Sequence, residues 1–473
     1  MTPTSSVTSG SAKSAAAGGL PQLPPFDHKP SLYTGPSRDE VLAMRREFLT
    51  PALVTYYKDP IMIVEGKMQY LFDEKGRRYL DMFAGIVTVS VGHSHPKVVA
   101  AVKEQSEKLM HTTTIYLHPN IAQFAKKLVS TFPKGSGLDK GVCYFTNSGG
   151  EANELAIMMA RLKTGAFDVI SLRNCYHGMS PFTMGISGLH TWKQPMPQGF
   201  GVHHARMPDR LRGPWGYDDA EAGRKYADDV LDLIRTGTTG QIAAFIAEPI
   251  QGVGGTVEMP PGYLKAVYEH VRAAGGLCIS DEVQTGFGRT GDAFWGFQSV
   301  GGPGVIPDCV TMAKGIGNGA PLACCVTKPE IAAAMTKRVH FNTYGGNPVS
   351  SAAGLATLNV MLDENIQGRA KEIGAYLIEG FHDLQKRHPI VGDVRGRGLM
   401  LGMEIVEDRK TNAPAGAKCA AIFERCKDLG VLVGKGGLNG NVLRIKPPMC
   451  ITKADCDFMC KVLDIALGEA AKG

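Results

Sequence analysis

The sequence of 473 residues lacks the features that would connect it with a membrane or with nucleic acid. It has no run of about 18 consecutive apolar residues, so we expect no membrane-spanning helix. Its 51 basic and 45 acidic residues are spread along the chain without a dense Lys/Arg block or an internal repeat, although the formal net charge is +6. We therefore expect neither a membrane nor a nucleic acid as a partner.

Cysteine and histidine patterns typical of metal sites are missing as well. The 11 cysteines form no CxxC pair and no zinc-like spacing, and several of them, such as Cys143, lie in apolar, strand-like runs. Such cysteines usually behave as small buried hydrophobic residues in a reducing compartment. The pairs His93/His95 and His203/His204 have no Cys, Asp or Glu partner at ligand spacing, so we predict no metal site.

The N-terminal segment is rich in Ser, Ala, Gly and Pro, with a single Lys13 and no acidic residue before Asp27. This composition is typical of a disordered tail and also of a transit peptide, although arginines are missing. It has no apolar core of the kind that a secretion signal carries. We interpret residues 1–31 as a flexible tail, or as what remains of a transit peptide.

Apolar, strand-like runs alternate with helical patterns over residues 95–364. Nearly continuous apolar runs are typical of parallel strands covered on both faces. We therefore predict an α/β fold with a large, doubly wound, mostly parallel sheet. Residues 32–94 and 365–473 mix helical patterns with short strands, and we expect them to form a smaller α+β domain from both chain ends. The strand-like runs of the large domain are GVCYFT (141–146), DVISLR (168–173), IAAFIAEP (242–249), GGLCISDE (275–282) and CVTMAK (309–314).

Three of these runs end in an ionisable residue, namely Glu248, Asp281 and Lys314. Glu248 and Asp281 are 33 positions apart, and so are Asp281 and Lys314. This spacing equals one strand–helix–strand unit, so the three side chains should emerge at one edge of the sheet. Charged residues often end strands by chance, but two carboxylates and an amine at this edge favour a binding or catalytic site.

A second candidate element is the segment NSGGEAN, in which Ser148 and Glu151 match the S-x-x-E capping box at the start of a helix. Gly149 and Gly150 leave the first backbone N–H groups open to an anion, which the helix dipole also attracts. A well-capped helix without a ligand explains this segment in isolation. Beside a lysine and an aspartate at strand ends, a phosphate becomes the favoured ligand.

Pyridoxal phosphate is the cofactor that needs all of these parts: a lysine, an acid for its ring nitrogen and a phosphate cradle. Tyr176 follows the strand-like run 168–173 and could cover the ring, or it could be an ordinary loop aromatic. The competing interpretation is that GIGNGA, residues 315–320, is a dinucleotide-binding loop. Pro321 and a further strand-like run follow it where that loop requires a helix, so we disfavour this alternative.

Several long motifs resemble the class III pyridoxal-phosphate aminotransferases, which have fold type I. The resemblance covers nearly all of the chain after about residue 45, and the motifs occur in the family order. They are NSGGEAN (147–153), AEPIQG (247–252), SDEVQTGFGRTG (280–291), PDCVTMAKGIGNGAPLA (307–323) and NTYGGNP (342–348).

The resemblance implies a role for each matching residue. It makes Lys314 the Schiff-base lysine and general acid/base, and Asp281 the partner of the pyridine nitrogen. It makes Gln284 the hydrogen-bond partner of the cofactor's phenolic oxygen, and Thr343 a phosphate contact from the neighbouring subunit. Such shared sites imply a homodimer or a tetramer built from it. The remaining residues expected to bind the cofactor are Ser148, Gly149, Gly150, Tyr176, His177 and Glu248.

Differences from relatives that act on ornithine limit the range of substrates that we expect. Arg444 matches the arginine that clamps a substrate carboxylate, and Val253 replaces the glutamate that pairs with that arginine there. Ile86 replaces an aromatic residue and Met179 an arginine, so the substrate pocket should be more apolar. The segment 171–209 looks most like the type-two alanine–glyoxylate aminotransferases.

These relatives imply ping-pong transfer from alanine or β-alanine to glyoxylate or pyruvate. They also imply a mitochondrial location, with a cytoplasmic one as the alternative. Two alternatives remain on the same scaffold. One is a different reaction of the cofactor, such as an aminomutase or another ω-amino acid transaminase. The other is a protein without catalytic activity, which has no chemical need for Lys314 and Asp281.

Overall fold

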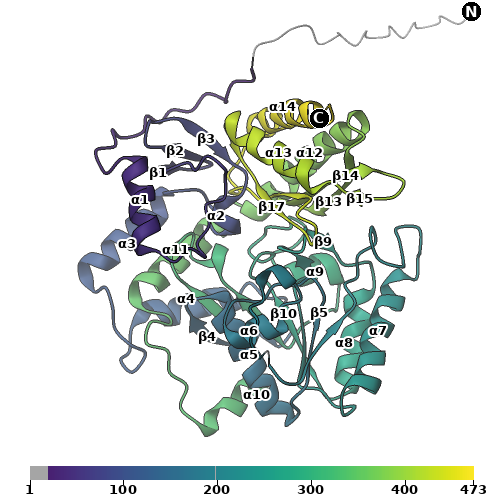
Figure 1. Cartoon of the computed structure of the whole chain (residues 1–473). Helices are drawn as coiled ribbons and strands as arrows, with labels where there is room; N and C mark the ends of the chain where they lie inside the picture. The colour runs from purple at the N-terminus through teal and green to yellow at the C-terminus, as the bar shows by residue number, and fades with distance from the viewer. Residues whose placement is uncertain (1–19, 198, 473) are drawn as a thin grey trace, which may run out of the picture.

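The computed structural model describes residues 20–197 and 199–472, so most of the predicted N-terminal tail lies outside the described residues. Figure 1 shows the C-terminal helices on one side of the molecule and the large sheet with its helices on the other. Within the described ranges, no helix is long and apolar enough to cross a membrane.

A seven-stranded sheet forms the centre of the large α/β part, in the order β4-β12-β11-β10-β7-β5-β6. Strand β12 is antiparallel to both of its neighbours, and every other neighbouring pair is parallel. The expected mostly parallel α/β sheet is thus confirmed. The strands are β4 (Val142–Thr146), β5 (Val169–Leu172), β6 (Val202–Ala205), β7 (Ala244–Ala247), β10 (Leu277–Asp281), β11 (Cys309–Met312) and β12 (Ala323–Thr327).

Helices cover both faces of this sheet, which explains why its strands are apolar on consecutive residues. Ile279 of β10 packs in the cluster beneath α5, whereas its neighbour Cys278 packs in the cluster beneath α7 and α8. Successive side chains of a strand point to opposite faces, so both must be apolar when both faces are covered. The helices of this part are α3 (Pro96–Lys108), α4 (Pro119–Val129), α5 (Gly149–Thr164), α6 (Pro181–Ile186), α7 (Ala222–Gly237), α8 (Tyr263–Ala273), α9 (Gly296–Gly301), α10 (Pro329–Ala332) and α11 (Pro348–Asp363).

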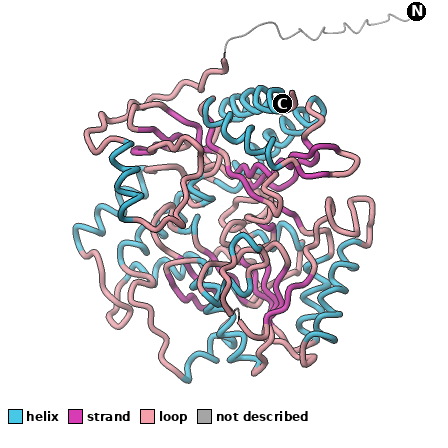
Figure 2. The backbone as a smooth tube through the Cα atoms, viewed as in Figure 1, coloured by secondary structure: helices cyan, strands magenta, loops and turns pink. Residues whose placement is uncertain are grey.

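The two chain ends meet in smaller sheets, seen as the upper magenta strands in Figure 2. Strand β16 (Val431–Leu432) from the C-terminal part pairs in parallel with β3 (Arg78–Asp81) near the N-terminus. Strands from both ends therefore share one sheet, while the domain boundaries at residues 94 and 364 stay predictions. The other elements are α1 (Arg38–Phe48), β1 (Ile63–Lys67), β2 (Tyr70–Asp73), α2 (Ala84–Val87), β8 (Ile250–Gln251), β9 (Val257–Glu258), α12 (Ile366–Arg387), β13 (Val391–Arg397), β14 (Met400–Asp408), β15 (Ala413–Pro414), α13 (Gly416–Asp428), β17 (Gly434–Gly436), β18 (Val442–Ile445) and α14 (Lys453–Ala470).

The described part of the N-terminal segment, residues 20–31, has no helix or strand but contacts the first hairpin. Arg78 donates a hydrogen bond of 2.6 Å to the carbonyl oxygen of Pro24. The ring of Phe26 lies 4.6 Å from that of Tyr70. These contacts tie the chain to β2 and β3 before α1 begins.

Candidate active site

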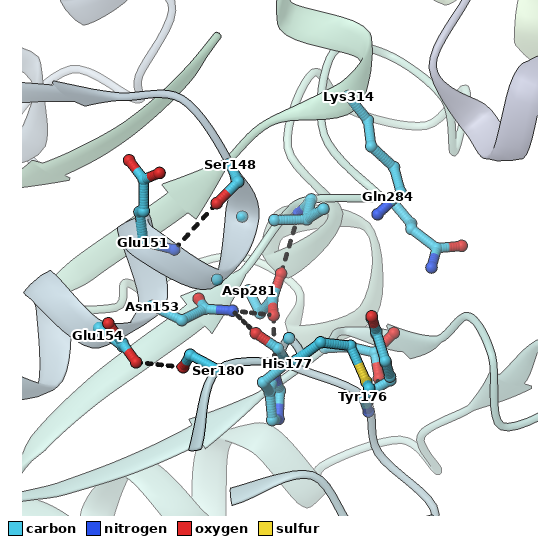
Figure 3. Close-up of a pocket in the computed structure, with 16 residues that line it drawn as sticks. Ser148, Glu151, Asn153, Glu154, Tyr176, His177, Ser180, Asp281, Gln284 and Lys314 are labelled. Atoms are coloured by element: carbon cyan, nitrogen blue, oxygen red, sulfur yellow. Dashed lines mark hydrogen bonds and ion pairs between the residues drawn. The ribbon is translucent and has the colours of Figure 1, made fainter. Parts of the chain in front are cut away.

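Glu248, Asp281 and Lys314 meet at one edge of the large sheet, as their spacing suggested. Glu248 follows β7, Asp281 is the last residue of β10, and Lys314 lies two residues after β11. These strands are parallel neighbours in the order β11-β10-β7, so their carboxyl ends lie side by side. All three side chains line a cavity of about 480 Å³, shown in Figure 3.

The N-terminus of α5 forms one wall of this cavity. Ser148 caps the helix, and its hydroxyl accepts a hydrogen bond of 3.3 Å from the backbone of Glu151. The second half of the expected capping box is absent, because the Glu151 carboxylate accepts from the backbone N–H of Asn147, at 2.9 Å, instead of that of Ser148. The first N–H groups of an α-helix have no partner within the helix, so Gly149 and Gly150 can donate to an anion.

A second glycine segment closes against this helix start. Gly178 has φ +141°, and a Cβ atom there would lie 2.6 Å from Thr183 Oγ1 and 2.9 Å from Gly150 Cα. Its loop is held by the Ser180 hydroxyl, which donates to Glu154 of α5. The two backbones approach so closely that only glycine fits, and they leave a small cradle lined with N–H groups.

Asp281 is surrounded by hydrogen-bond donors. Its Oδ2 lies 2.7 Å from His177 Nδ1 and accepts from Asn153 Nδ2 at 2.9 Å, while Oδ1 accepts from the backbone of Val283 at 3.1 Å. Burial opposes the charge of His177, whereas Cys175 and the hydrogen bond to Asp281 favour it, and they raise its pKa well above the ordinary value. The buried Asp281 carboxylate is thus paired with an imidazole whose positive form is favoured.

Glu248 lines the cavity, but both of its oxygens are used by the backbone. Oε1 accepts from the N–H of Tyr176 at 3.1 Å, and Oε2 accepts from that of Gly252 at 2.7 Å. Burial, together with the nearby charge of Asp281, raises the pKa of Glu248. The carboxylate thus holds two loops of the cavity wall in place.

Lys314 reaches the cavity from a strained backbone position, with φ +48°. Among the described residues, none forms a hydrogen bond or an ion pair with its amine. Burial lowers the pKa of Lys314, against the opposing effect of Asp281 and Glu248. A lowered pKa and the lack of a partner among the described residues suit this amine to act as a nucleophile or a base. The turn at residues 314–316 leads into antiparallel β12 instead of a helix, which argues against the dinucleotide loop.

Tyr176 and Gln284 complete the wall. The Tyr176 ring lines the cavity and receives an edge contact from Trp192 at 5.3 Å between ring centroids. In Figure 3 the Gln284 amide lies beside the Lys314 amine. Gln284 Oε1 accepts a hydrogen bond of 3.1 Å from Lys446, a buried residue that the sequence did not single out.

The three remaining candidates do not line the cavity in the single chain. Arg444 of β18 is buried, with Nη1 3.5 Å from the Gly252 oxygen and its guanidinium 5.0 Å from the Phe83 ring centroid. Ile86 is 47% exposed in α2, and Thr343 is exposed in the loop before α11. Their roles, like those of the other site residues, stay predictions.

Asn153 is a functional candidate that the sequence pattern did not indicate. Besides Asp281, its amide donates to the carbonyl oxygen of His177 at 2.9 Å, and its Oδ1 accepts from Thr311 at 2.6 Å. It thereby links α5 to β10 and β11 beneath the cavity. Asn153 could have been recognised as the one amide among the small and apolar residues that α5 buries against the sheet.

Comparisons with known proteins identify the family of this chain. The family model described as "Aminotransferase class-III" matches residues 54–467. The chain is 54% identical over 448 residues to alanine–glyoxylate aminotransferase 2 homolog 2, mitochondrial, of Arabidopsis thaliana, covering 95% of this chain and 91% of that protein.

Solved structures resemble the whole fold. A phospholyase from Arthrobacter in complex with phosphoethanolamine has 34% identity and a TM-score of 0.83, covering 90% of this chain and 99% of its own. An amine transaminase from an uncultivated Pseudomonas species, in a PLP-bound form, has 30% identity and a TM-score of 0.82, with 90% and 99% covered.

Proposed function

Because the chain belongs to the class-III aminotransferase family, we propose that it transfers the amino group of a small amino acid to glyoxylate or pyruvate. Alanine is the first candidate donor, and β-alanine is the second. The observation that carries the proposal is that one cavity brings together Lys314, whose amine has no partner among the described residues, the Asp281 carboxylate paired with His177, and a glycine cradle. The name of the Arabidopsis relative supports the pair alanine and glyoxylate.

Pyridoxal 5′-phosphate is the cofactor that we assign to this cavity. The cradle made by the start of α5 and the Gly178 loop fits a phosphate, because these glycines line the cavity and the first N–H groups of α5 have no partner within the helix. Asp281 fits a protonated ring nitrogen, and Tyr176 offers an aromatic surface. The amine of Lys314 fits the carbonyl group, and a solved relative is described as PLP-bound.

When bound, this cofactor supplies a carbonyl group for amines and a ring that accepts the electron pair released at the substrate's carbon. Lys314 would take the proton from that carbon and return it to the cofactor side, for which its lowered pKa is suited. Asp281, held in place by His177 and Asn153, would keep the proton on the ring nitrogen. Donor and acceptor then use the same site in turn, which gives ping-pong kinetics.

The surroundings of Arg444 support a small substrate with a carboxylate. No carboxylate pairs with Arg444 among the described residues; its hydrogen bonds go to the carbonyl oxygens of Lys435 and Gly252. Val253 stands where a pairing glutamate occurs in relatives that act on ornithine. A guanidinium without an acidic partner is free to bind a carboxylate with two hydrogen bonds. Met179 in the cavity wall adds no charge that would attract a second amino group.

We also propose a homodimer in which Thr343 completes the phosphate site of the other subunit. Apolar side chains of the loop at residues 109–117 are exposed, with Ile115 at 71% and Leu117 at 104%. Tyr344, next to Thr343, is 61% exposed and lies 5.2 Å from the ring of His111 in that loop. A contiguous apolar surface around Thr343 is typical of a protein–protein interface.

A panel of amino donors against keto acids tests the proposed reaction. We expect turnover with alanine and glyoxylate, and a strict need for both substrates. Turnover of one substrate alone would favour an aminomutase, and phosphate release from phosphoethanolamine would favour a phospholyase. A purified protein that takes up no pyridoxal phosphate would contradict all three reactions.

The cellular location is also inferred from a relative. The Arabidopsis relative is named as mitochondrial, and we propose that location for this chain too. Fractionation of cells that express the full chain with a C-terminal tag tests it. Recovery in the cytosol alone would contradict the proposal.

A further inference from the structure

Lys446 lies directly behind the cavity wall. It follows β18 and is fully buried, with Nζ 3.1 Å from Gln284 Oε1 and 3.3 Å from the carbonyl oxygen of Gly252. Among the described residues, these oxygens are the only hydrogen-bond partners of the Lys446 amine, and no carboxylate pairs with it. A buried amine without a counter-ion destabilises the fold, so an apolar residue would fill this space at a lower cost.

One partner of Lys446 lines the cavity, and the other is hydrogen-bonded to a residue that lines it. Gln284 lines it beside Lys314, and the Gly252 N–H donates to Glu248, which also lines it. Gln284 lies directly against Gly252, since a Cβ atom there would be only 2.3 Å from Gln284 Oε1. Lys446 therefore contacts Gln284 on the side away from the cavity, and the other side of Gln284 would meet a ligand.

The contact determines which atom of Gln284 faces a ligand. A lysine amine has a hydrogen to donate in either protonation state, and the amide oxygen accepts it. Nε2 is then the amide atom left to donate to an oxygen in the cavity. In Figure 3 the amide oxygen of Gln284 points away from the Lys314 side chain.

The charges around Lys446 agree with this arrangement. Burial and the neighbouring Arg444 lower its pKa well below the ordinary value, with Arg289 and Lys314 adding to the effect and Glu248 opposing it. The amine donates one hydrogen to Gln284 Oε1 and one to the Gly252 oxygen, so its contact with Gln284 does not depend on a counter-ion.

We propose that Lys446 is a positioning residue, which fixes the Gln284 amide so that Nε2 donates to the phenolic oxygen of the cofactor. The inference rests on the proposed function. A donor at this oxygen draws negative charge away from the nitrogen that joins Lys314 to the cofactor. Without the donor, the pKa of the nitrogen between Lys314 and the cofactor would be higher, so this nitrogen would lose its proton only at a higher pH.

The test compares cofactor-loaded wild type with Lys446→Met, which keeps most of the side-chain length and removes Nζ. The readout is the pH midpoint of the visible absorbance change of the bound cofactor, which a purely structural role would not move. We expect the midpoint to rise by about 0.5–1 pH unit, the size of one hydrogen bond. An unchanged midpoint would overturn the proposal.

A double-mutant cycle shows whether Lys446 acts through Gln284. In a Gln284→Leu background, Lys446→Met should move the midpoint no further. An equal shift in both backgrounds would mean that Lys446 acts by another route. Lys427→Met is the matched control, because Lys427 is also a buried lysine but pairs with Glu424 and Asp428, and it should leave the midpoint unchanged.

A second variant covers the case in which Lys446→Met does not fold. Lys446→Gln keeps a polar end on a side chain that is one bond shorter, and it must move the midpoint in the same direction. If the wild type is coloured and active and both variants have the same pH midpoint as the wild type, the role of Lys446 is refuted. The proposed function then still stands. A wild type that binds no cofactor would refute the proposed function and this inference with it.

Discussion

His177 Nδ1 and Asp281 Oδ2 lie 2.7 Å apart, and both side chains are buried. A buried carboxylate normally gains a proton unless a positive charge or several hydrogen bonds stabilise it. His177 supplies the charge, while Asn153 and the backbone of Val283 supply the further hydrogen bonds. These contacts hold the Asp281 carboxylate at the place where a protonated ring nitrogen would need it.

The His177–Asp281 pair should make stability depend on pH. The pKa of His177 is raised in the folded protein, so its contribution is complete below the unfolded value of about 6.5 and is lost as pH rises through the folded value. The difference in unfolding free energy between wild type and His177→Gln should therefore be largest in acid and shrink toward alkaline pH. Urea unfolding of the cofactor-free proteins measures it, and a difference that grows with pH would contradict the pairing.

Replacement of Gly178 should open the phosphate cradle. The added Cβ atom of Gly178→Ala would collide with Thr183 and Gly150, pushing the loop away from α5. We expect the dissociation constant of pyridoxal phosphate to rise about tenfold or more, about 1.4 kcal/mol. Gly135→Ala is the matched control, since Gly135 has φ +76° but open space around it. Equal cofactor affinity in both variants would argue against the cradle.

Glu248→Gln should destabilise the protein. Two backbone N–H groups now donate hydrogen bonds to the carboxylate, and the new amide NH₂ group must face one of them, so two donors would meet. The two backbone N–H groups belong to Tyr176 and Gly252. We expect a loss of about 1–3 kcal/mol in the free energy of unfolding. Glu107→Gln, at an exposed position of α3, should change it little. Equal unfolding curves for the two variants would show that the contacts of Glu248 contribute nothing.

Shared active sites predict complementation between two inactive variants. Lys314→Ala removes the reactive amine, and Thr343→Asp places a negative charge against the phosphate of the other subunit. A heterodimer of the two variants contains one site with both defects and one intact site. We expect about half of the wild-type turnover per dimer, because one of two symmetric sites works.

Heterodimers purified with two different affinity tags give the measurement. Homodimers of each variant are the controls, and both should be inactive. An inactive heterodimer would place Thr343 in the site of its own chain. Purification of the wild type as a monomer would contradict the shared site altogether.

The regular spacing of Glu248, Asp281 and Lys314 allowed the sheet edge to be predicted from the sequence. Each residue follows a strand that is apolar on both faces, and such runs are easy to recognise. The capping box was half wrong, because Glu151 bonds to Asn147. A local motif shows which residues are near one another in sequence. The conformation of the loop before the helix determines which backbone N–H donates to the Glu151 carboxylate.

Asn153 and Lys446 could not be found in the same way. Their partners come from distant segments: Lys446 contacts Gln284, which is 162 positions away, and Asn153 contacts Asp281, which is 128 positions away. No periodic pattern records such contacts, since each is created by the packing of several strands. Thr343 stays outside the cavity of one chain, and only the resemblance assigned it a role.

The central claim is that Lys314 is the amine that holds the cofactor. Borohydride reduction of the cofactor-loaded protein, followed by peptide mass mapping, tests it most directly. The account predicts a stable phosphopyridoxyl group on the Lys314 amine, and none on a folded Lys314→Ala variant without turnover. A modification on another lysine, or none on the active wild type, would contradict the account.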